Sequence, residues 1–550
     1  MFQEKSNFIK TIIKRDLEKN KYQSVVTRFP PEPNGFLHLG HARAIIVNFE
    51  LSKFFKGKTY LRYDDTNPRS EKKIYVDSIL EDIHWLGYQP DKVFFSSDYF
   101  EEIFQKAVLL IKKGKAFVDD LNSEQIKNTR GDFQNAGLDS PYRNRSIETN
   151  LLLFYQMKEG LFQEGEKVLR AKINMDNPNM NLRDPVLYRI LDAYTLKNKH
   201  YFIFPSYDFA HPLGDSIEGI THSLCSLEFE DHRPLYDWVI RETEMQNIPT
   251  QIEFGRLNVS QIVLSKRHLK TLIEHDLVSG WDDPRIPTLK GMRRKGYTPE
   301  SIKKFVLESG LSRNNTFVDF KMLENSIRNE LQYKVKKVMV VTDPLKVTIL
   351  NYPENKREFT EVPYDDCLKE LGTRKVFFSK YLYIEKDDFQ IEKKDPSSKK
   401  LFLNGEVRLF HFYFIKAVDV IRNNEGEIIE ILAFYDPETK SGTGFNKRKP
   451  NGTIHFIEQM NVQKVFINFF QPLFKTSYPK NIIDEFNFDS FQQKEAFIEG
   501  SLYFNSNYEK FQFLRKGYFI LDLEQQKNSI INFNEIVSLR NLYNTKKSSM

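Results

Sequence analysis

The chain has 550 residues, of which 40% are hydrophobic and 28% are charged, a composition typical of a globular protein. Its 81 lysines and arginines against 75 aspartates and glutamates give a net charge of +6, which permits a nucleic-acid partner without requiring one. The two cysteines, Cys225 and Cys367, exclude a disulfide framework and a four-cysteine zinc site. No segment approaches the ~20 apolar residues that span a membrane, and residues 1–23 predict a short amphipathic helix, so we expect a cytoplasmic protein.

Residues 1–96 alternate between predicted strands and helices. Residues 24–29 (SVVTRF), KTYLRY and residues 92–97 (KVFFSS) have the composition of strands. Between them lie two segments with apolar residues at helical spacing, one of them Ala42, Ile45, Ile46 and Phe49. Strand, helix, strand, helix, strand predicts a doubly wound parallel sheet of Rossmann type, which binds ligands beyond the carboxyl ends of its strands.

The rest of the chain changes character three times. Residues 97–206 mix helical and polar segments and are predicted to be an insertion, after which the sheet resumes near Tyr207 and runs over 207–257. Residues 258–333 predict helices, including one at 299–310 that ends at a glycine. From 334 to 550 the pattern is that of strands, so we expect an α/β protein with a helical subdomain and one or two C-terminal β-barrels.

Four clusters of basic residues lie in the C-terminal half, at 290–295, 334–337, 393–400 and 447–449. Each cluster alone is most simply a solvated surface. Together, spread along so much of the chain, they favour contact with a long polyanion.

The motif His38-Leu39-Gly40-His41 follows a predicted strand and a loop rich in proline and glycine, and opens a predicted helix. A helix N-terminus presents free N–H groups to an anion, and Gly40 lets a nucleotide approach the backbone closely. Two histidines on one side can donate hydrogen bonds to phosphate oxygens. The alternatives are half of a metal site, for which no third ligand is apparent, and two histidines without a joint role. We therefore predict a phosphate site and no metal site.

A second motif, Val263-Leu264-Ser265-Lys266-Arg267, carries a lysine and a serine that can hold a departing pyrophosphate. On its own it is most simply a solvated loop. Together with the HLGH motif, it forms a sequence signature that is much more specific than either motif alone.

HLGH followed by LSK resembles the paired signatures of class I aminoacyl-tRNA synthetases. Longer segments resemble the glutaminyl-tRNA synthetases of bacterial type, over nearly the whole chain from 22 to 540. The segments are RFPPEPNGFLHLGHARA, LRYDDTNP, SPYRNRS, LRDPVLYRI, YDFAHPLGDSIEGITHSLCSLEFEDHRPLYDW, GWDDPRIPTLKGMRRKGYTPESI and PNGTIHF. Bacterial glutamate enzymes differ more, because their anticodon end is helical whereas this one is predicted to be β.

The resemblance implies an ATP site in which His38, His41 and Lys266 are catalytic. A magnesium ion would accompany the ATP phosphates. Leu264 stands where the family usually has methionine, a change of similar volume. The residues implied to bind ATP are Glu32, Pro33, Asn34, His38, Leu39, Gly40, His41, Ser226, Arg256, Leu257, Leu264, Ser265 and Lys266.

For glutamine, the resemblance implies that Arg28 binds the carboxylate and Asp64 the ammonium, while Tyr207 and Gln251 read the side-chain amide. Relatives that charge glutamate carry arginine at the position of Cys225, and an unpaired buried carboxylate would need such a charge. A small neutral thiol here favours glutamine. Packing alone would also explain Cys225 and a strand tyrosine at 207.

For tRNA, Asp231 resembles a residue that reads the minor groove of the acceptor stem. Gln512 and Arg515 match base-reading positions of relatives. Lys337 and Lys400 replace arginines and Ser397 replaces a glutamine, which leaves the base contacts open.

We therefore predict a monomeric glutamine–tRNA ligase whose partners are ATP, L-glutamine and tRNA(Gln). Glutamate charging by a near relative, and a catalytically inactive RNA-binding paralogue, are the alternatives. Intact His38, His41 and Lys266 disfavour the second of these.

Overall fold

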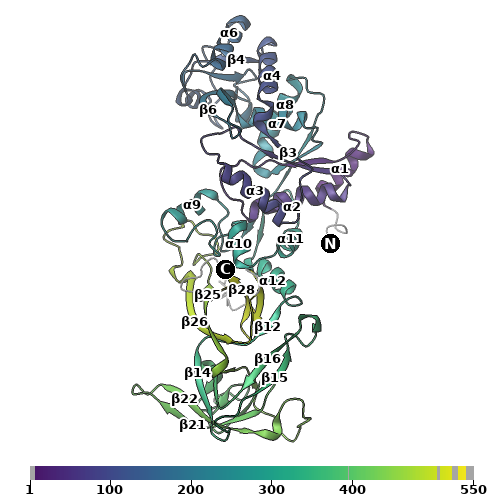
Figure 1. Ribbon diagram of the computed structural model, residues 1–550. Helices are drawn as coiled ribbons and strands as arrows, with labels where there is room; N and C mark the ends of the chain where they lie inside the picture. Colours follow the sequence, from purple (N-terminus) through teal and green to yellow (C-terminus); the bar gives the residue numbers. More distant parts are fainter. Residues whose placement is uncertain (1–6, 394, 505–507, 523–530, 540–550) are drawn as a thin grey trace.

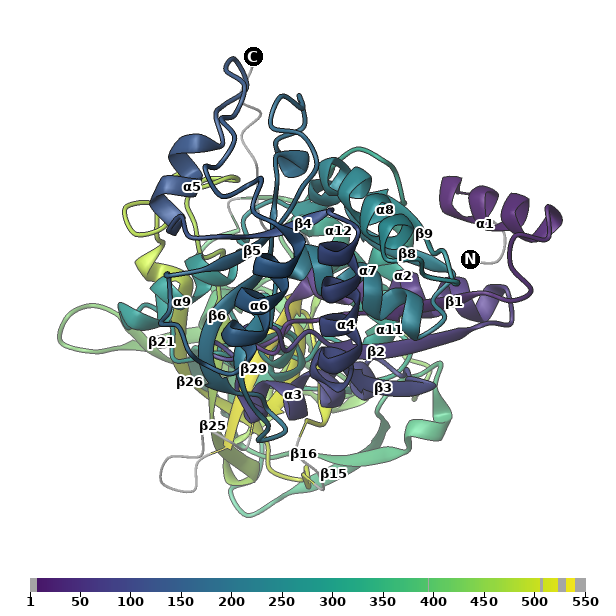
Figure 2. The same ribbon diagram turned by 90° about the horizontal axis from the view of Figure 1, so that it is seen from above.

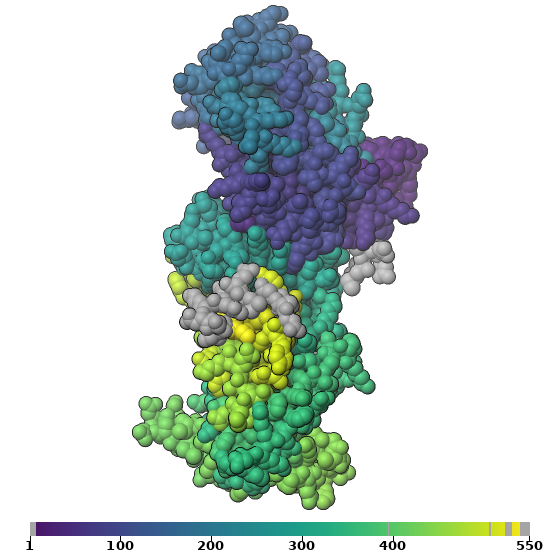
Figure 3. Space-filling view, viewed as in Figure 1, coloured from purple at the N-terminus to yellow at the C-terminus, as the bar shows by residue number. Residues whose placement is uncertain are grey.

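The computed structural model describes residues 7–393, 395–504, 508–522 and 531–539. The molecule is elongated (Figure 3). The N-terminal sheet and the insertion lie at one end, β-sheets lie at the other, and helices join them (Figure 1). None of the helices in these ranges has the length and apolar character of a membrane span.

The N-terminal sheet is parallel. Strands β1 (Val26–Phe29), β2 (Lys58–Tyr63) and β3 (Lys92–Phe95) are neighbours in that order, and β8 (His222–Ser226) pairs with β9 (Thr250–Phe254). Thr221 joins the two sets, because its N–H donates to the carbonyl of Val26 at 2.9 Å and its hydroxyl accepts from the N–H of Val26 at 2.8 Å. The order β3–β2–β1–β8–β9 reverses direction at β1, and ligands bind doubly wound sheets at such a point. The predicted Rossmann-type sheet is confirmed.

Helices α2 (Leu39–Phe54) and α3 (Lys73–Trp85) connect the first three strands, as predicted. Ala42, Ile45, Ile46 and Phe49 are buried in the core between sheet and helices. Helix α1 (Phe8–Glu18), predicted from its amphipathic pattern, lies outside the sheet beside β8 and β9 (Figure 2).

The segment between β3 and β8 contains its own antiparallel sheet in the order β4–β5–β6–β7. Helices α4 and α6 lie side by side, with the rings of Phe104 and Phe154 stacked at 4.7 Å (Figure 2). The bounds are α4 (Phe100–Lys112), β4 (Ala116–Asp119), α5 (Ser123–Thr129), α6 (Ile147–Lys158), β5 (Val168–Ala171), β6 (Val186–Tyr194) and β7 (His200–Pro205).

The expected return of the strand pattern at Tyr207 is wrong. Tyr207 is the first residue of helix α7 (Tyr207–Ile217), after Ser206 at the N-cap position, and the next strand is β8. The apolar residues of α7 bury one helical face, which a reading by strand alternation misassigns. A 3-10 helix, η3 (Leu227–His232), and α8 (Arg233–Glu242) then lie between β8 and β9.

The middle region is helical as predicted, with two short strands, β10 (Leu257–Val259) and β11 (Thr316–Val318), that were not predicted. Its helices are α9 (Lys266–Glu274), α10 (Leu289–Lys295), α11 (Pro299–Glu308) and α12 (Phe320–Leu331). Helix α11 ends before Gly310, whose φ of +76° suits a glycine. Leu269 and Leu272 of α9 pack against Leu473 and Phe474 of the C-terminal part.

Two seven-stranded sheets, each with its own apolar core, form the barrel-like C-terminal part. One has the order β23–β20–β21–β22–β14–β17–β24 and the other β12–β27–β28–β29–β25–β26–β13. Their bounds are β12 (Lys336–Val338), β13 (Val340–Val341), β14 (Pro344–Ile349), β17 (Tyr381–Glu385), β20 (Glu406–Leu409), β21 (Phe414–Arg422), β22 (Ile428–Asp436), β23 (Thr453–Ile454), β24 (Ile457–Glu458), β25 (Val462–Phe470), β26 (Phe491–Glu499), β27 (Lys510–Phe513), β28 (Gly517–Asp522) and β29 (Ile531–Ser538). Smaller pairs are β15 (Glu358–Pro363) with β16 (Thr373–Phe378), and β18 (Phe389–Gln390) with β19 (Leu401–Phe402).

Candidate active site

The N-terminus of α2 carries the HLGH motif beside the carboxyl end of β1. His38 is the N-cap residue, and its Nδ1 accepts from the backbone N–H of Gly40 at 3.1 Å. His41 reaches back, so that its Nδ1 accepts from the N–H of His38 at 3.1 Å. The two rings lie 3.8 Å apart. A Cβ at Gly40 would come within 2.9 Å of the His38 ring, so glycine is needed for this cap.

These bonds fix the tautomers of both imidazoles. Each Nδ1 accepts from a backbone N–H and therefore carries no proton, which places the ring proton of a neutral imidazole on Nε2. Burial and the charge of Lys266 lower the pKa of His38 to about 3. Burial, followed by His38 and Lys266, lowers the pKa of His41 as well. The pair is thus neutral at pH 7 and presents two Nε2–H donors at a helix N-terminus, where an anion binds.

Lys266 reaches the same place although it lies 232 residues after Asn34 in the sequence. Its Nζ donates to Oδ1 of Asn34 at 2.5 Å, and its side chain packs against Gly35, where an added Cβ would lie 3.4 Å away. Burial lowers the pKa of Lys266, and the carboxylate of Glu32 opposes that shift. The structure therefore brings His38, His41 and Lys266 around one site.

The other residues predicted to bind ATP surround this site or lie near it. Glu32 Oε1 accepts from the hydroxyl of Ser70 at 3.0 Å, and the carbonyl of Pro33 accepts from the N–H of Lys72. Ser265 is the N-cap of α9, and Leu264 packs against the core around α2, close to Gly40.

At the end of β8, Ser226 donates to Glu228 at 2.6 Å, and Glu228 forms an ion pair with Arg256. Leu257 is buried in β10. Leu39 is buried at the start of α2. Arg256 and Ser226 are thus linked through one carboxylate.

Arg28 occupies a fully buried position on β1. Its Nε and Nη2 donate to the two oxygens of Asp215 at 3.0 and 3.1 Å, and its Nη1 donates to the carbonyl of Leu224 at 2.7 Å. Asp215 also accepts from Arg62 at 2.7 Å. Although burial alone would raise it, Arg28, His211 and Arg62 hold the pKa of Asp215 far below its usual range. The charge of Arg28 is therefore matched inside the protein, and its binding of a substrate carboxylate stays a prediction.

Asp64, predicted to bind the ammonium group, is 9% exposed at the end of β2. It accepts from the hydroxyl of Thr66 at 2.9 Å. Burial raises its pKa. A cationic ligand would lower that pKa again, so a carboxylate at this place suits an amine.

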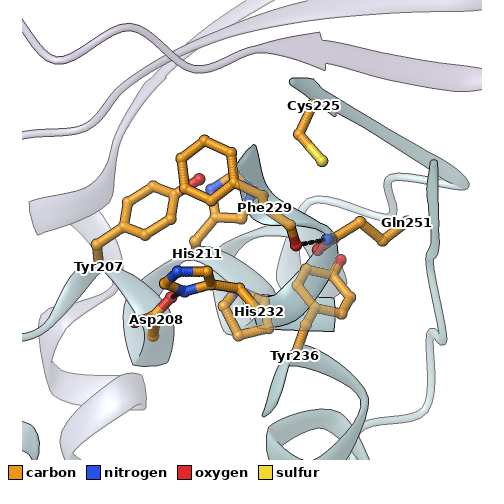
Figure 4. A pocket seen from close by; sticks show the side chains of 9 residues that line it. Tyr207, Asp208, His211, Cys225, Phe229, His232, Tyr236 and Gln251 are labelled. Carbon is orange, nitrogen blue, oxygen red and sulfur yellow. Dashed lines mark hydrogen bonds and ion pairs between the residues drawn. The ribbon is translucent and has the colours of Figure 1, made fainter. Parts of the chain in front are cut away.

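A pocket next to Arg28 collects the residues predicted to read the amide (Figure 4). The ring of Tyr207 stacks on His211 at 4.8 Å, and Phe229 lies 5.4 Å from Tyr207. Burial, followed by the charge of Glu253, raises the pKa of Cys225 to about 12, so this thiol is neutral. The residues that line the pocket are Tyr207, Asp208, His211, Pro212, Cys225, Phe229, His232, Tyr236 and Gln251.

The residues predicted to contact tRNA are divided between the two ends of the molecule. Asp231 is exposed on η3, next to the pocket, and its carbonyl accepts from Asn179 of the insertion at 2.7 Å. In the C-terminal sheets, Lys337 on β12 is the direct partner of Gln512 on β27.

Lys400 and Arg515 form ion pairs with the adjacent residues Asp387 and Asp388, both at 2.6 Å. Ser397 donates to Asp395 at 2.8 Å. The structure thus groups Lys337 with Gln512 and Lys400 with Arg515.

Sequence reasoning missed the groups that surround Arg28 and Gln251. Asp215 and His211 lie on α7 and contact residues more than 180 positions away, which no local pattern reveals. Glu253 could have been found, because it lies two residues after Gln251 within 207–257, where the sheet was predicted to resume, and alternate residues of a strand share a face.

Comparisons with known proteins show the family of the chain. Residues 24–333 match the catalytic domain of the tRNA synthetases class I (E and Q), and residues 335–436 and 453–522 match anticodon-binding domains of the same family. The chain belongs to this family and is an aminoacyl-tRNA ligase.

Within this family, the chain is similar over nearly its full length to several glutamine–tRNA ligases. Glutamine–tRNA ligase of Clostridium perfringens is 48% identical over 98% of this chain and 99% of its own length. The enzyme of the same name from Clostridium kluyveri is 48% identical over 98% of each chain, and that of Pseudomonas syringae is 44% identical over 97% of this chain and 95% of its own.

Proposed function

We propose that this enzyme activates L-glutamine with ATP and transfers it to the 2′-hydroxyl of the terminal adenosine of tRNA(Gln). The observation that carries the proposal is the pairing of two sites at one edge of the sheet. The N-terminus of α2, with Lys266, offers hydrogen-bond donors and one cation for phosphates. The pocket beside β8 offers polar groups, and its one charged pair, His232 with Asp208 at 2.8 Å, is matched within the lining, so no unmatched cation faces an amide.

In the first step, a carboxylate oxygen of glutamine attacks the α-phosphorus of ATP. The new O–P bond replaces the bond to the β-phosphate, and pyrophosphate leaves. The Nε2–H groups of His38 and His41 donate to phosphate oxygens, and Lys266 offsets the charge that builds on the leaving group. Mg²⁺ enters as the counter-ion of ATP, since it prefers phosphate oxygens and water.

In the second step, the 2′-hydroxyl attacks the acyl carbon of the adenylate and AMP leaves, with the hydroxyl proton passing to the phosphate or to water. The predicted insertion, 97–206, and Asp231 hold the acceptor stem. The helical region at 258–333, between the two ends of the molecule, contacts the tRNA stem, and the barrels at 334–550 hold the anticodon through Lys337, Lys400, Gln512 and Arg515. We place the enzyme in the cytoplasm as a monomer.

Glutamine is favoured over glutamate because the pocket holds no free positive charge. Arg28 and Arg62 share Asp215, and Arg62 also pairs with Glu218 at 3.0 Å, so neither has charge left for a substrate side-chain carboxylate. Burying an unpaired carboxylate is costly, and a site built for a hydrogen-bonding group rejects the wrong substrate by ~10⁴–10⁵.

The direct test is charging of total tRNA with labelled glutamine and, separately, glutamate. We expect glutamine to be attached and glutamate to be attached far less. A preference for glutamate would overturn the proposal. So would the absence of pyrophosphate release when ATP, glutamine and tRNA are present together, which is the behaviour of an inactive RNA-binding paralogue.

Cys225→Arg sharpens that test. The new guanidinium would lie beside the amide position and attract a carboxylate, so we expect the glutamine-to-glutamate ratio of kcat/KM to fall by at least tenfold. The matched control is Cys367→Arg, at an exposed cysteine of the C-terminal part, which should leave the ratio unchanged. An unchanged ratio in Cys225→Arg would contradict the pocket assignment.

A further inference from the structure

Gln251 and Glu253 stand on one face of β9. They are two residues apart in a strand, so their side chains point the same way. Both are buried, at 8% and 7% exposure, and they lie opposite Ser223 and Cys225 of β8. Ile252, between them, points to the other face, into the apolar core under α1.

The amide of Gln251 has only one orientation that satisfies its neighbours. Its Nε2 lies 2.9 Å from Oε1 of Glu253 and 3.2 Å from the backbone carbonyl of Phe229, the contact drawn in Figure 4. A carboxylate and a carbonyl only accept hydrogen bonds, and a primary amide has two N–H groups. Both N–H groups are therefore used, and turning the amide over would press its oxygen against two acceptors.

This orientation decides what Gln251 can offer to a ligand. With both N–H groups engaged, only Oε1 remains, and none of the residues that the structure describes donates a hydrogen bond to it. Gln251 lines the pocket together with Tyr207 and Cys225. An acceptor with no donor beside it binds an N–H group, which a carboxamide has and a carboxylate lacks.

Glu253 is itself held in place. Its second oxygen, Oε2, lies 3.4 Å from Nη1 of Arg233, the first residue of α8. Arg233 is 43% exposed at its side chain, so the pair reaches the surface while Oε1 faces Gln251. The carboxylate thus has a counter-ion on one side and the Gln251 amide on the other.

We propose that Glu253 is a positioning residue for glutamine selection: it holds Gln251 so that its acceptor oxygen, and not its donor nitrogen, faces the bound side chain. This inference rests on the proposed function and adds a cause for its specificity. The pocket recognises the substrate amide through the side-chain amide of Gln251, whose orientation Glu253 fixes.

Glu253→Gln tests the proposal with a change of almost no volume. The new amide can donate to Oε1 of Gln251, which lets Gln251 turn and present N–H groups to the pocket. We expect the glutamine-to-glutamate ratio of kcat/KM to fall by roughly tenfold or more, the size of one hydrogen bond to a charged group. The KM for ATP should stay within twofold. Because each ratio is measured on one preparation, it does not depend on the fraction of folded enzyme.

A second variant separates positioning from a general effect of the charge. Gln251→Met removes the oriented dipole and should lower the ratio by itself. If Glu253 acts through Gln251, adding Glu253→Gln to Gln251→Met should change the ratio less than twofold. Equal effects of Glu253→Gln in both backgrounds would overturn the positioning role.

Glu230→Gln is the matched control. Glu230 also lies beside Arg233, at 3.9 Å, and in the part of the chain that the structure describes no hydrogen bond joins it to Gln251, so the ratio should not change. If the unmodified enzyme fails to prefer glutamine, the proposed function fails. If it prefers glutamine and Glu253→Gln keeps the same ratio, only the present inference fails.

Discussion

The two halves of the active site are built in different ways. At the phosphate end, backbone N–H groups within four residues of chain fix the tautomers of His38 and His41. At the glutamine end, Arg28 and Arg62, from β1 and β2, are matched by the buried carboxylates of Asp215 on α7 and of Glu218, the residue after that helix.

This difference predicts how substitutions affect each half of the site. A cap made by a helix on itself survives changes elsewhere, because the backbone supplies its partners. A buried cluster of charges depends on each of its members, because removing one leaves the others uncompensated in a medium of low dielectric. We therefore expect substitutions in the cluster to act on stability and substitutions at the phosphate end to act on rate.

Asp215→Asn should have the largest effect. It removes a charge that two fully buried arginines share, so the free energy of unfolding of the catalytic part should fall by about 3–5 kcal/mol. Urea denaturation would measure it. Asp98→Asn is the control: Asp98 pairs with Lys197 at the surface at 2.5 Å, and its loss should change stability by less than about 1 kcal/mol. An equal decrease in the free energy of unfolding in Asp215→Asn and Asp98→Asn would contradict the special dependence of the buried cluster on each charge.

Lys266→Ala should act on rate alone. Removal of one group that stabilises developing charge typically slows a reaction by ~10²–10³-fold, and we expect that loss in pyrophosphate release with ATP, glutamine and tRNA present. The affinity for tRNA should stay within about twofold. Lys270→Ala, an exposed position on the same helix that pairs with Glu274, is the control and should keep the full rate. Reduced tRNA affinity with an unchanged rate would show that the lysine belongs to the RNA surface instead.

The pH dependence of stability tests the neutral state of His38. Because the pKa of His38 is lowered to about 3 in the folded protein, against ~6.5 in an unfolded chain, the unfolded state binds the proton first. Its contribution to stability is complete above pH ~6.5 and is lost as the pH falls toward 3, by at most about 1.4 kcal/mol per pH unit. Between pH 7 and 4, the free energy of unfolding should fall more steeply as the pH is lowered in the wild type than in His38→Gln. An equal dependence on pH in the two proteins would contradict the assignment.

The regular elements could be predicted because their patterns are local. The strand KTYLRY is β2 with the same bounds, Lys58–Tyr63, and the helix predicted at 299–310 is α11, Pro299–Glu308. Tyr207 was misassigned because apolar residues beside a strand were read as its continuation, although they belong to α7. The strands β10 and β11 are three residues each, too short to leave a pattern.

The same reasoning explains which part of the site could be predicted. His38, Gly40 and His41 form a contiguous motif whose chemistry follows from a helix N-terminus. The partners of Arg28 could not be predicted, because Asp215 lies 187 residues away and only the fold brings it near. Resemblance to a family supplied Gln251, but not the reason for its orientation, which depends on Glu253 and the carbonyl of Phe229.

Helix α1 has a consequence for how this protein is handled. Ile9 and Ile13 cover Leu224 and Ile252, whose strand neighbours Cys225 and Gln251 face the pocket. A chain trimmed to begin after Glu18 would leave the back of β8 and β9 in water. Shortened versions made for crystallisation or screening would then lack the wall behind their glutamine pocket, although every residue that faces the substrate is still present.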